Sequence, residues 1–94
     1  MKNADNAKVT IRYCPRCKWL LRAGWYAQEL LSTFSSDLYE VGLVPSPDAG
    51  IFTIEFDDSV VMDRKVDGFL DAKEIKRRVR DHIDPDRSLG HIDS

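Results

Sequence analysis

The chain has 94 residues, a formal net charge of −2, 43% hydrophobic residues and 32% charged residues. These values are typical of one folded globular domain and exclude an intrinsically disordered chain. A nucleic-acid partner is not expected, because nucleic-acid-binding modules usually carry net positive charge. No apolar run approaches the roughly 20 residues that a membrane-spanning helix needs, and residues 1–7 lack the apolar segment of a secretion signal. We therefore expect a cytoplasmic protein with no membrane partner.

The first half of the chain predicts a strand, a helix and a second strand. Residues 8–13 alternate polar and apolar side chains and are rich in β-branched types, which is typical of a short strand. Residues 18–34 carry apolar side chains at helical spacing. The stripe expected to be buried consists of Leu20, Ala23, Ala27, Leu30, Leu31 and Phe34. Trp25 and Tyr26 lie off this stripe. Residues 38–44 are apolar and predict a buried strand.

The second half of the chain predicts a β-hairpin followed by a helix. Residues 51–56 and 60–62 flank a tight turn of two aspartates, and residues 65–68 are interpreted as a further turn. Asp71 is followed by Glu74 three residues later, which fits the capping-box pattern at the start of a helix.

Together these elements give the order strand, helix, strand, strand, strand, helix. The first two strands should be parallel, and the hairpin adds antiparallel strands. The expected fold is α/β (α+β) and thioredoxin-like, a mixed four-stranded sheet with two helices. We place the domain at residues 8–84, because Pro85 ends the last helix, and expect flexible tails at residues 1–7 and 85–94.

The most informative motif is Cys14-Pro15-Arg16-Cys17, at the junction of the first strand and the first helix. In the cytoplasm a close cysteine pair is more often catalytic or metal-binding than a structural disulfide. Unpaired N–H groups and the positive end of a helix favour the thiolate, which is the attacking species. We interpret Cys14 and Cys17 as a catalytic thiol–disulfide pair in which Cys14 attacks and Cys17 resolves, with the reverse order left open.

Three other interpretations concern the same motif. Zinc needs four ligands, and the only further candidates, His82 and His91, lack zinc-finger spacing, so no metal site is expected. Pro15, Arg16 and Trp19 are predicted to form a surface for a substrate or a protein partner. The alternative to a redox enzyme is therefore a non-catalytic protein-binding module whose binding is switched by the disulfide.

Several spaced elements carry a family resemblance. They are Tyr13–Cys17 with Trp19, Arg22, Ala23 and Trp25, the run Gly50–Ile54, Asp67-Gly68-Phe69, and Leu89-Gly90-His91. In this combination the chain resembles the selenoprotein W-like family, also called the SelT/SelW/SelH or Rdx family.

The resemblance implies a thioredoxin-like fold and a role in cell redox homeostasis. It also implies partners that are protein thiols or glutathione, with glutathione as a co-substrate and no bound cofactor. In selenoprotein members of this family, selenocysteine occupies the second position of the motif, which corresponds to Cys17. That correspondence complicates the choice of the attacking cysteine, because selenocysteine would be the better nucleophile.

Overall fold

The computed structural model of the protein describes residues 7–90, and its sheet is organised around a central first strand. The elements are β1 (Ala7–Tyr13), the 3₁₀ helix η1 (Pro15–Cys17), α1 (Leu20–Phe34), β2 (Leu38–Pro45), β3 (Phe52–Phe56), β4 (Ser59–Asp63), α2 (Arg64–Asp67) and α3 (Ala72–Ile83). The strand order is β2-β1-β3-β4. The β1–β2 pair is parallel, and β3 pairs antiparallel with β1 and β4, so the expected mixed thioredoxin-like sheet is confirmed.

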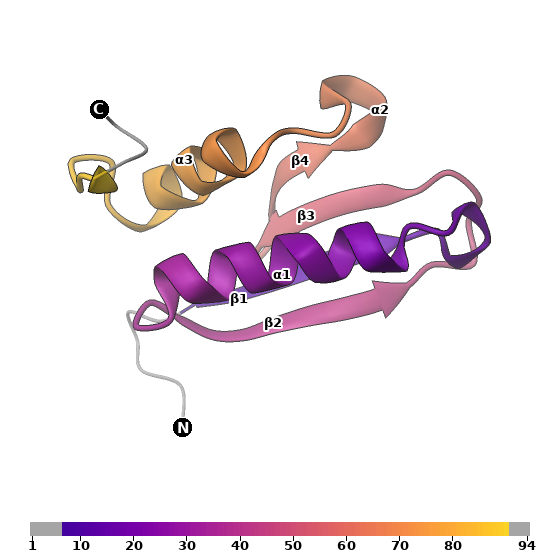
Figure 1. Ribbon diagram of the computed structural model, residues 1–94, viewed down its shortest axis with the longest axis horizontal. Coiled ribbons are helices and arrows are strands. Elements are labelled where there is room, and N and C mark those ends of the chain that lie inside the picture. Colours follow the sequence, from indigo (N-terminus) through magenta and orange to yellow (C-terminus); the bar gives the residue numbers. More distant parts are fainter. Residues whose placement is uncertain (1–6, 91–94) are drawn as a thin grey trace.

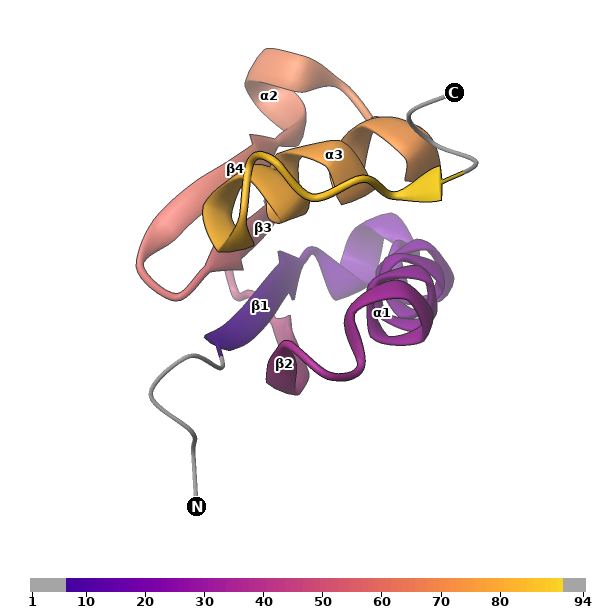
Figure 2. The same ribbon diagram turned by 90° about the vertical axis from the view of Figure 1, so that its left-hand side faces the viewer.

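The sheet buries one face beneath the helices. Alternate side chains of a strand point to opposite faces, and Val9, Ile11 and Tyr13 of β1 are buried whereas Arg12 is exposed. The two longer helices, α1 and α3, lie over the same side of the sheet (Figures 1 and 2). The core therefore forms between one face of the sheet and the helical layer.

The buried face of α1 differs from the one that the sequence predicted. Tyr26 is fully buried, whereas Leu20 and Leu31 are 50% and 39% exposed. The reason is that α1 packs against both the sheet and α3, so its buried face turns towards Tyr26. The Tyr26 hydroxyl donates a hydrogen bond to the carbonyl oxygen of Leu70, just before α3. Burial raises the pKa of Tyr26, and the neighbouring Arg22 partly opposes this rise.

Two further predictions about local structure were wrong. Strand β2 is not buried, because it lies at the edge of the sheet, and Tyr39 and Leu43 are 46% and 38% exposed. Residues 65–68, interpreted as a turn, belong largely to the short helix α2. The described part of the chain therefore contains three α-helices rather than the two expected.

Residues on both sides of the range 8–84 also contact the body of the protein. Ala7, assigned to the N-terminal tail, is the first residue of β1 and is buried. In the segment expected to be a C-terminal tail, Arg87 forms an ion pair with Asp37 at 2.7 Å, and Leu89 packs against the core. Both contacts hold residues after Pro85 against the body of the protein.

The hairpin and the start of the last helix agree with the sequence patterns. Strands β3 and β4 pair across the aspartate turn, with Phe52, Ile54 and Phe56 buried. The Asp71 side chain accepts a hydrogen bond from the Glu74 N–H at 2.8 Å, so Asp71 is the N-cap of α3. Within residues 7–90, no helix has the length and apolar composition required to cross a bilayer.

The short helix α2 is fixed at both ends by carboxylates. The Asp63 side chain accepts from the Lys65 N–H, and the Asp67 carboxylate accepts from the Asp63 N–H, each at 3.0 Å. Asp67 also pairs with Arg78 of α3 at 3.3 Å. A four-residue helix is not stable alone, so these bonds determine where α2 places its first residue, Arg64.

We expect the variant Asp67→Asn to show a pH-dependent loss of stability. The pKa of Asp67 is lowered, first by the hydrogen bond from the Asp63 N–H and then by Arg78. A lowered folded-state pKa gives stability that is present above the unfolded pKa of about 3.9 and lost as pH falls through the folded value. Urea unfolding should therefore show a less stable variant at pH 7 and a smaller difference at pH 2.

The exposed turn variant Asp58→Asn serves as the matched control and should show little change at either pH. Asparagine at position 67 keeps an oxygen that can accept the Asp63 N–H, so the comparison isolates the negative charge. A stability deficit of Asp67→Asn that persists undiminished at pH 2 would contradict this account.

Candidate redox site

The two cysteines are joined in a disulfide that brackets the 3₁₀ helix η1. Cys14 follows β1 directly and is the N-cap of η1, and Cys17 is its last residue. Their Cα atoms lie 5.3 Å apart, within the usual range for a disulfide. The Cys17 N–H donates to the Cys14 sulfur at 3.2 Å. Pro15 occupies the first helical position, where its missing N–H has no helical partner to lose.

The sequence suggested that the cysteine pair lies at the first turn of the long helix. In the structure it lies before that helix, in η1. Lys18 adopts a left-handed conformation with φ of 61°, and its N–H closes η1 by donating to the Pro15 carbonyl. Helix α1 begins only at Leu20, with Trp19 as an N-cap that makes no side-chain hydrogen bond. The left-handed residue thus separates the cysteines from the first turn of α1.

The two cysteines differ in accessibility. Cys14 is only 1% exposed, because it continues the buried end of β1. Cys17 is half-buried, since η1 turns outward after Pro15. Cys17, interpreted from the sequence as the resolving cysteine, is therefore the one that a substrate in solution can approach.

The surroundings of the pair are positively charged. Arg16, Lys18 and Arg22 are exposed, and within residues 7–90 none of them forms an ion pair with a carboxylate. Arg16 instead donates to the Pro47 carbonyl at 3.2 Å, which ties the motif to the loop after β2. Positive charge that is not neutralised favours a thiolate over a thiol.

Trp19 is held in an aromatic cluster and is not a free surface side chain. Its ring meets Phe52 and Phe69 edge to face, with centroids 6.0 and 5.3 Å apart. The Arg64 guanidinium lies 4.9 Å from its ring centroid and donates to the Gly50 carbonyl at 3.0 Å. Arg64 and Phe69 were missed as site residues, because only the placement of α2 brings them to Trp19.

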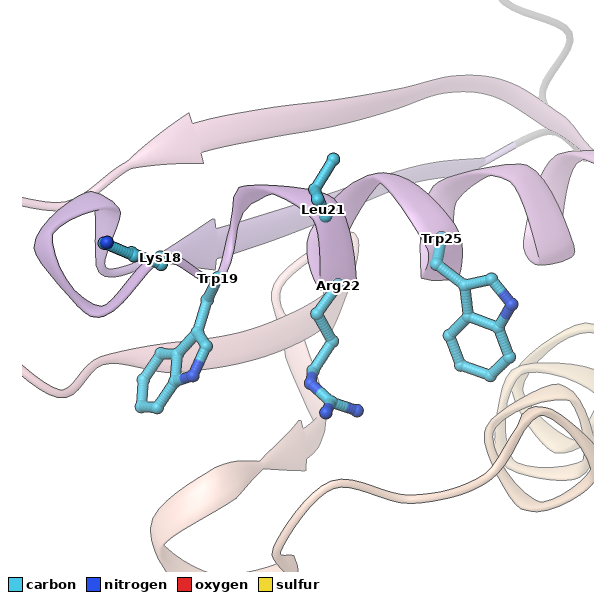
Figure 3. A pocket seen from close by; sticks show the side chains of 5 residues that line it. All are labelled: Lys18, Trp19, Leu21, Arg22 and Trp25. Carbon is cyan, nitrogen blue, oxygen red and sulfur yellow. The ribbon is translucent and has the colours of Figure 1, made fainter.

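The surface next to the pair is hollowed into a groove of about 360 Å³. It is lined by Lys18, Trp19, Leu21, Arg22 and Trp25 (Figure 3). The other two residues expected to form a partner surface, Pro15 and Arg16, are exposed on η1 but do not line this groove. Trp19 therefore lines the groove, whereas Pro15 and Arg16 are exposed on η1 outside it.

The remaining candidates do not gather at the motif. Across residues 7–90, no three His, Cys, Asp or Glu side chains are grouped so that they could hold a metal ion. His82 is exposed on α3, where its Nδ1 lies 3.1 Å from the Arg78 carbonyl oxygen and its ring contacts Phe56. His91 lies outside the described residues.

The fold and the disulfide-bonded motif define a thioredoxin-like protein with a CxxC pair at the end of its first strand. The model of the Rdx family matches residues 8–81, and the chain belongs to this family. No curated protein matches the chain.

Two crystal structures extend the comparison. A protein from Bordetella parapertussis is 54% identical, with a TM-score of 0.78 over 82% of this chain and 98% of its own. A selenoprotein W-related protein from Vibrio cholerae is 44% identical, with a TM-score of 0.81 over 84% of this chain and 99% of its own. Membership of this family, together with the disulfide-bonded pair, indicates a redox-related protein.

The unequal burial of the cysteines predicts unequal reactivity. After reduction of the disulfide, a short pulse of iodoacetamide should modify Cys17 several times faster than Cys14, because alkylation requires an accessible thiolate. Peptide mapping by mass spectrometry measures both rates in one sample. In denaturant the two rates should converge, and faster labelling of Cys14 in the folded protein would refute the assignment.

Proposed function

We propose that this protein is a thiol–disulfide oxidoreductase in which Cys17 attacks and Cys14 resolves. The observation that carries the proposal is a pair close enough to form a disulfide, with one partner buried and the other accessible. The exposed cations near Cys17 support its ionisation. This order of attack reverses our first assignment and agrees with the selenocysteine position in the family that the chain resembles.

The proposed cycle needs only sulfur chemistry. The Cys17 thiolate attacks one sulfur of a substrate disulfide, forms a mixed disulfide and releases the other half as a thiolate. The Cys14 thiolate then attacks the Cys17 sulfur, forms the Cys14–Cys17 disulfide and releases the second substrate thiolate. The substrate disulfide gains two electrons and the protein dithiol loses two. With a protein disulfide as the substrate, two molecules of glutathione restore the dithiol by the reverse exchange and leave as glutathione disulfide. With glutathione disulfide as the substrate, a protein dithiol restores it and is oxidised to a disulfide.

The substrates proposed for this cycle are glutathione disulfide or the disulfides of protein partners, in a cytoplasmic role in redox homeostasis. No further cofactor is required, because the two sulfurs carry both electrons. Pro15 and Arg16 lie between the cysteines and are exposed, so a bound substrate would contact them first.

A second function is a binding module switched by the disulfide. The observation in its favour is the groove beside the pair, together with Leu21, which is 86% exposed at its margin. Such a module would bind a protein through this surface and would show no disulfide turnover. The two functions therefore differ in whether the cysteines catalyse repeated disulfide exchange.

Cysteine variants test the proposed cycle. With glutathione disulfide, Cys14→Ser should accumulate a mixed disulfide at Cys17, because the resolving thiol is absent. Cys17→Ser should form little adduct, since the remaining thiol is buried. Both variants should lose disulfide turnover to the background rate. Intact-protein mass spectrometry measures the adducts, and a coupled assay that follows glutathione measures disulfide turnover.

Two other outcomes would change the proposed roles of the cysteines. An adduct on Cys14 in the Cys17→Ser variant, with none in Cys14→Ser, would reverse the two roles. Absence of any adduct and of turnover in the wild type, with retained binding of a protein partner, would replace the oxidoreductase with the binding module.

A further inference from the structure

The groove that begins at the residue after Cys17 has the composition of an anion site. Its lining consists of two cations, two indoles and one leucine, with no carboxylate. We propose that this groove is a substrate subsite that binds the carboxylate of a small thiol or disulfide while its sulfur reacts at Cys17. The inference rests on the proposed redox function and specifies the substrate class.

The two cations of the groove are available to a ligand. Within the described part of the chain, Lys18 and Arg22 form no ion pair, whereas Arg12, Lys76 and Arg87 are paired with carboxylates at 2.7 to 2.9 Å. An anion that enters the groove therefore does not have to displace an internal carboxylate. Its binding gains the charge interaction without the cost of breaking an existing pair.

Arg22 is held in an orientation that suits carboxylate recognition. Its guanidinium carbon lies 4.1 Å from the centroid of the Phe69 ring. Such stacking covers one face of the guanidinium and restricts its motion. The guanidinium also interacts with the neighbouring Tyr26, but it carries five N–H groups and keeps others for a bidentate contact with a carboxylate. Phe69 is in turn fixed by its contacts with Trp19 and Phe52.

The aromatic side chains provide walls for the body of the ligand. Trp19, Arg22 and Trp25 extend from the same side of the N-terminal half of α1, with Arg22 between the two indoles (Figure 3). Trp25 is 41% exposed, so part of its ring is open to a ligand. A groove of about 360 Å³ lies in the range of small-molecule sites. The site therefore fits a small organic thiol better than a folded protein surface.

The position of the groove connects it to the chemistry. Lys18 is the next residue after Cys17, and consecutive Cα atoms are about 3.8 Å apart. We expect a ligand whose carboxylate lies a few bonds from its sulfur to reach the Lys18 end of the groove while the sulfur is bonded to Cys17. The predicted class is small thiols and disulfides with a free carboxylate, in preference to neutral or cationic compounds of equal size.

Three disulfides of similar size test this preference: 3,3′-dithiodipropionate is anionic, bis(2-hydroxyethyl) disulfide is neutral and cystamine is cationic. The attack step is isolated by measuring adduct formation in the Cys14→Ser background. There, Arg22→Gln and Lys18→Gln should each slow the reaction with the anionic disulfide, together by roughly tenfold. The rate with the neutral disulfide should fall less, because it loses only the effect of the two cations on Cys17 ionisation, so the ratio of the anionic to the neutral rate should fall several-fold. The exposed cation variant Lys73→Gln is the matched control and should leave all three rates unchanged.

A ligand that cannot undergo thiol–disulfide exchange tests binding in the groove independently of the redox function. The thioether 3,3′-thiodipropionate should change the tryptophan fluorescence of the oxidised wild type, and this change should be lost in Arg22→Gln. Such binding in a protein inert to all three disulfides would support the subsite and overturn the redox function. An equal slowing of all three disulfides by Arg22→Gln and Lys18→Gln, without thioether binding, would overturn the subsite. Circular dichroism of each variant checks that it is folded.

Discussion

The position of β1 between β2 and β3 determines where the sulfur chemistry can occur. Strand β1 is paired along its length on both sides, and its last residue, Tyr13, is still buried when Cys14 follows. Parallel strands end at the same edge of a sheet, so the loop after β2 meets the end of β1 there. The Ser46 N–H donates to the Tyr13 carbonyl, and Arg16 donates to the Pro47 carbonyl. These bonds hold the cysteine motif against the loop on the neighbouring strand.

The aromatic cluster explains how positive charge is kept at the site without being neutralised. An ion pair with a carboxylate would reduce the effect of a cation on a thiolate. Here Arg22 lies over Phe69 and Arg64 over Trp19, so rings rather than carboxylates hold both guanidinium groups. The cation–π contact fixes the position of each charge and preserves it. The packing of the core and the electrostatics of the site are thus consequences of the same contacts.

The parts of the fold that follow local patterns could be predicted from the sequence. Alternation in β1 and β3 and the cap at Asp71 depend on neighbouring residues alone, and so does the CxxC motif. The burial of Tyr26 depends on where α3 packs, and the exposure of β2 depends on its edge position, so neither is visible in a local pattern. The different burial of the two cysteines likewise arises from the tertiary fold. Arg64 reaches the site only because hydrogen bonds such as that from the Asp63 N–H to the Asp67 carboxylate fix the position of α2.

In the proposed cycle, an accessible Cys17 thiolate beside uncompensated cations has a consequence for substrate choice. A thiolate that attacks an anionic disulfide brings two like charges together, and unit charges about 4 Å apart repel by roughly 4 kcal/mol near a protein surface. Neutral disulfides avoid this repulsion. A site with a single cation would therefore favour neutral disulfides, because that cation already interacts with the thiolate. Lys18 and Arg22 provide two positive charges, one for each negative group. The number of free cations, rather than the cysteine motif itself, is therefore the feature that suits this site to anionic substrates.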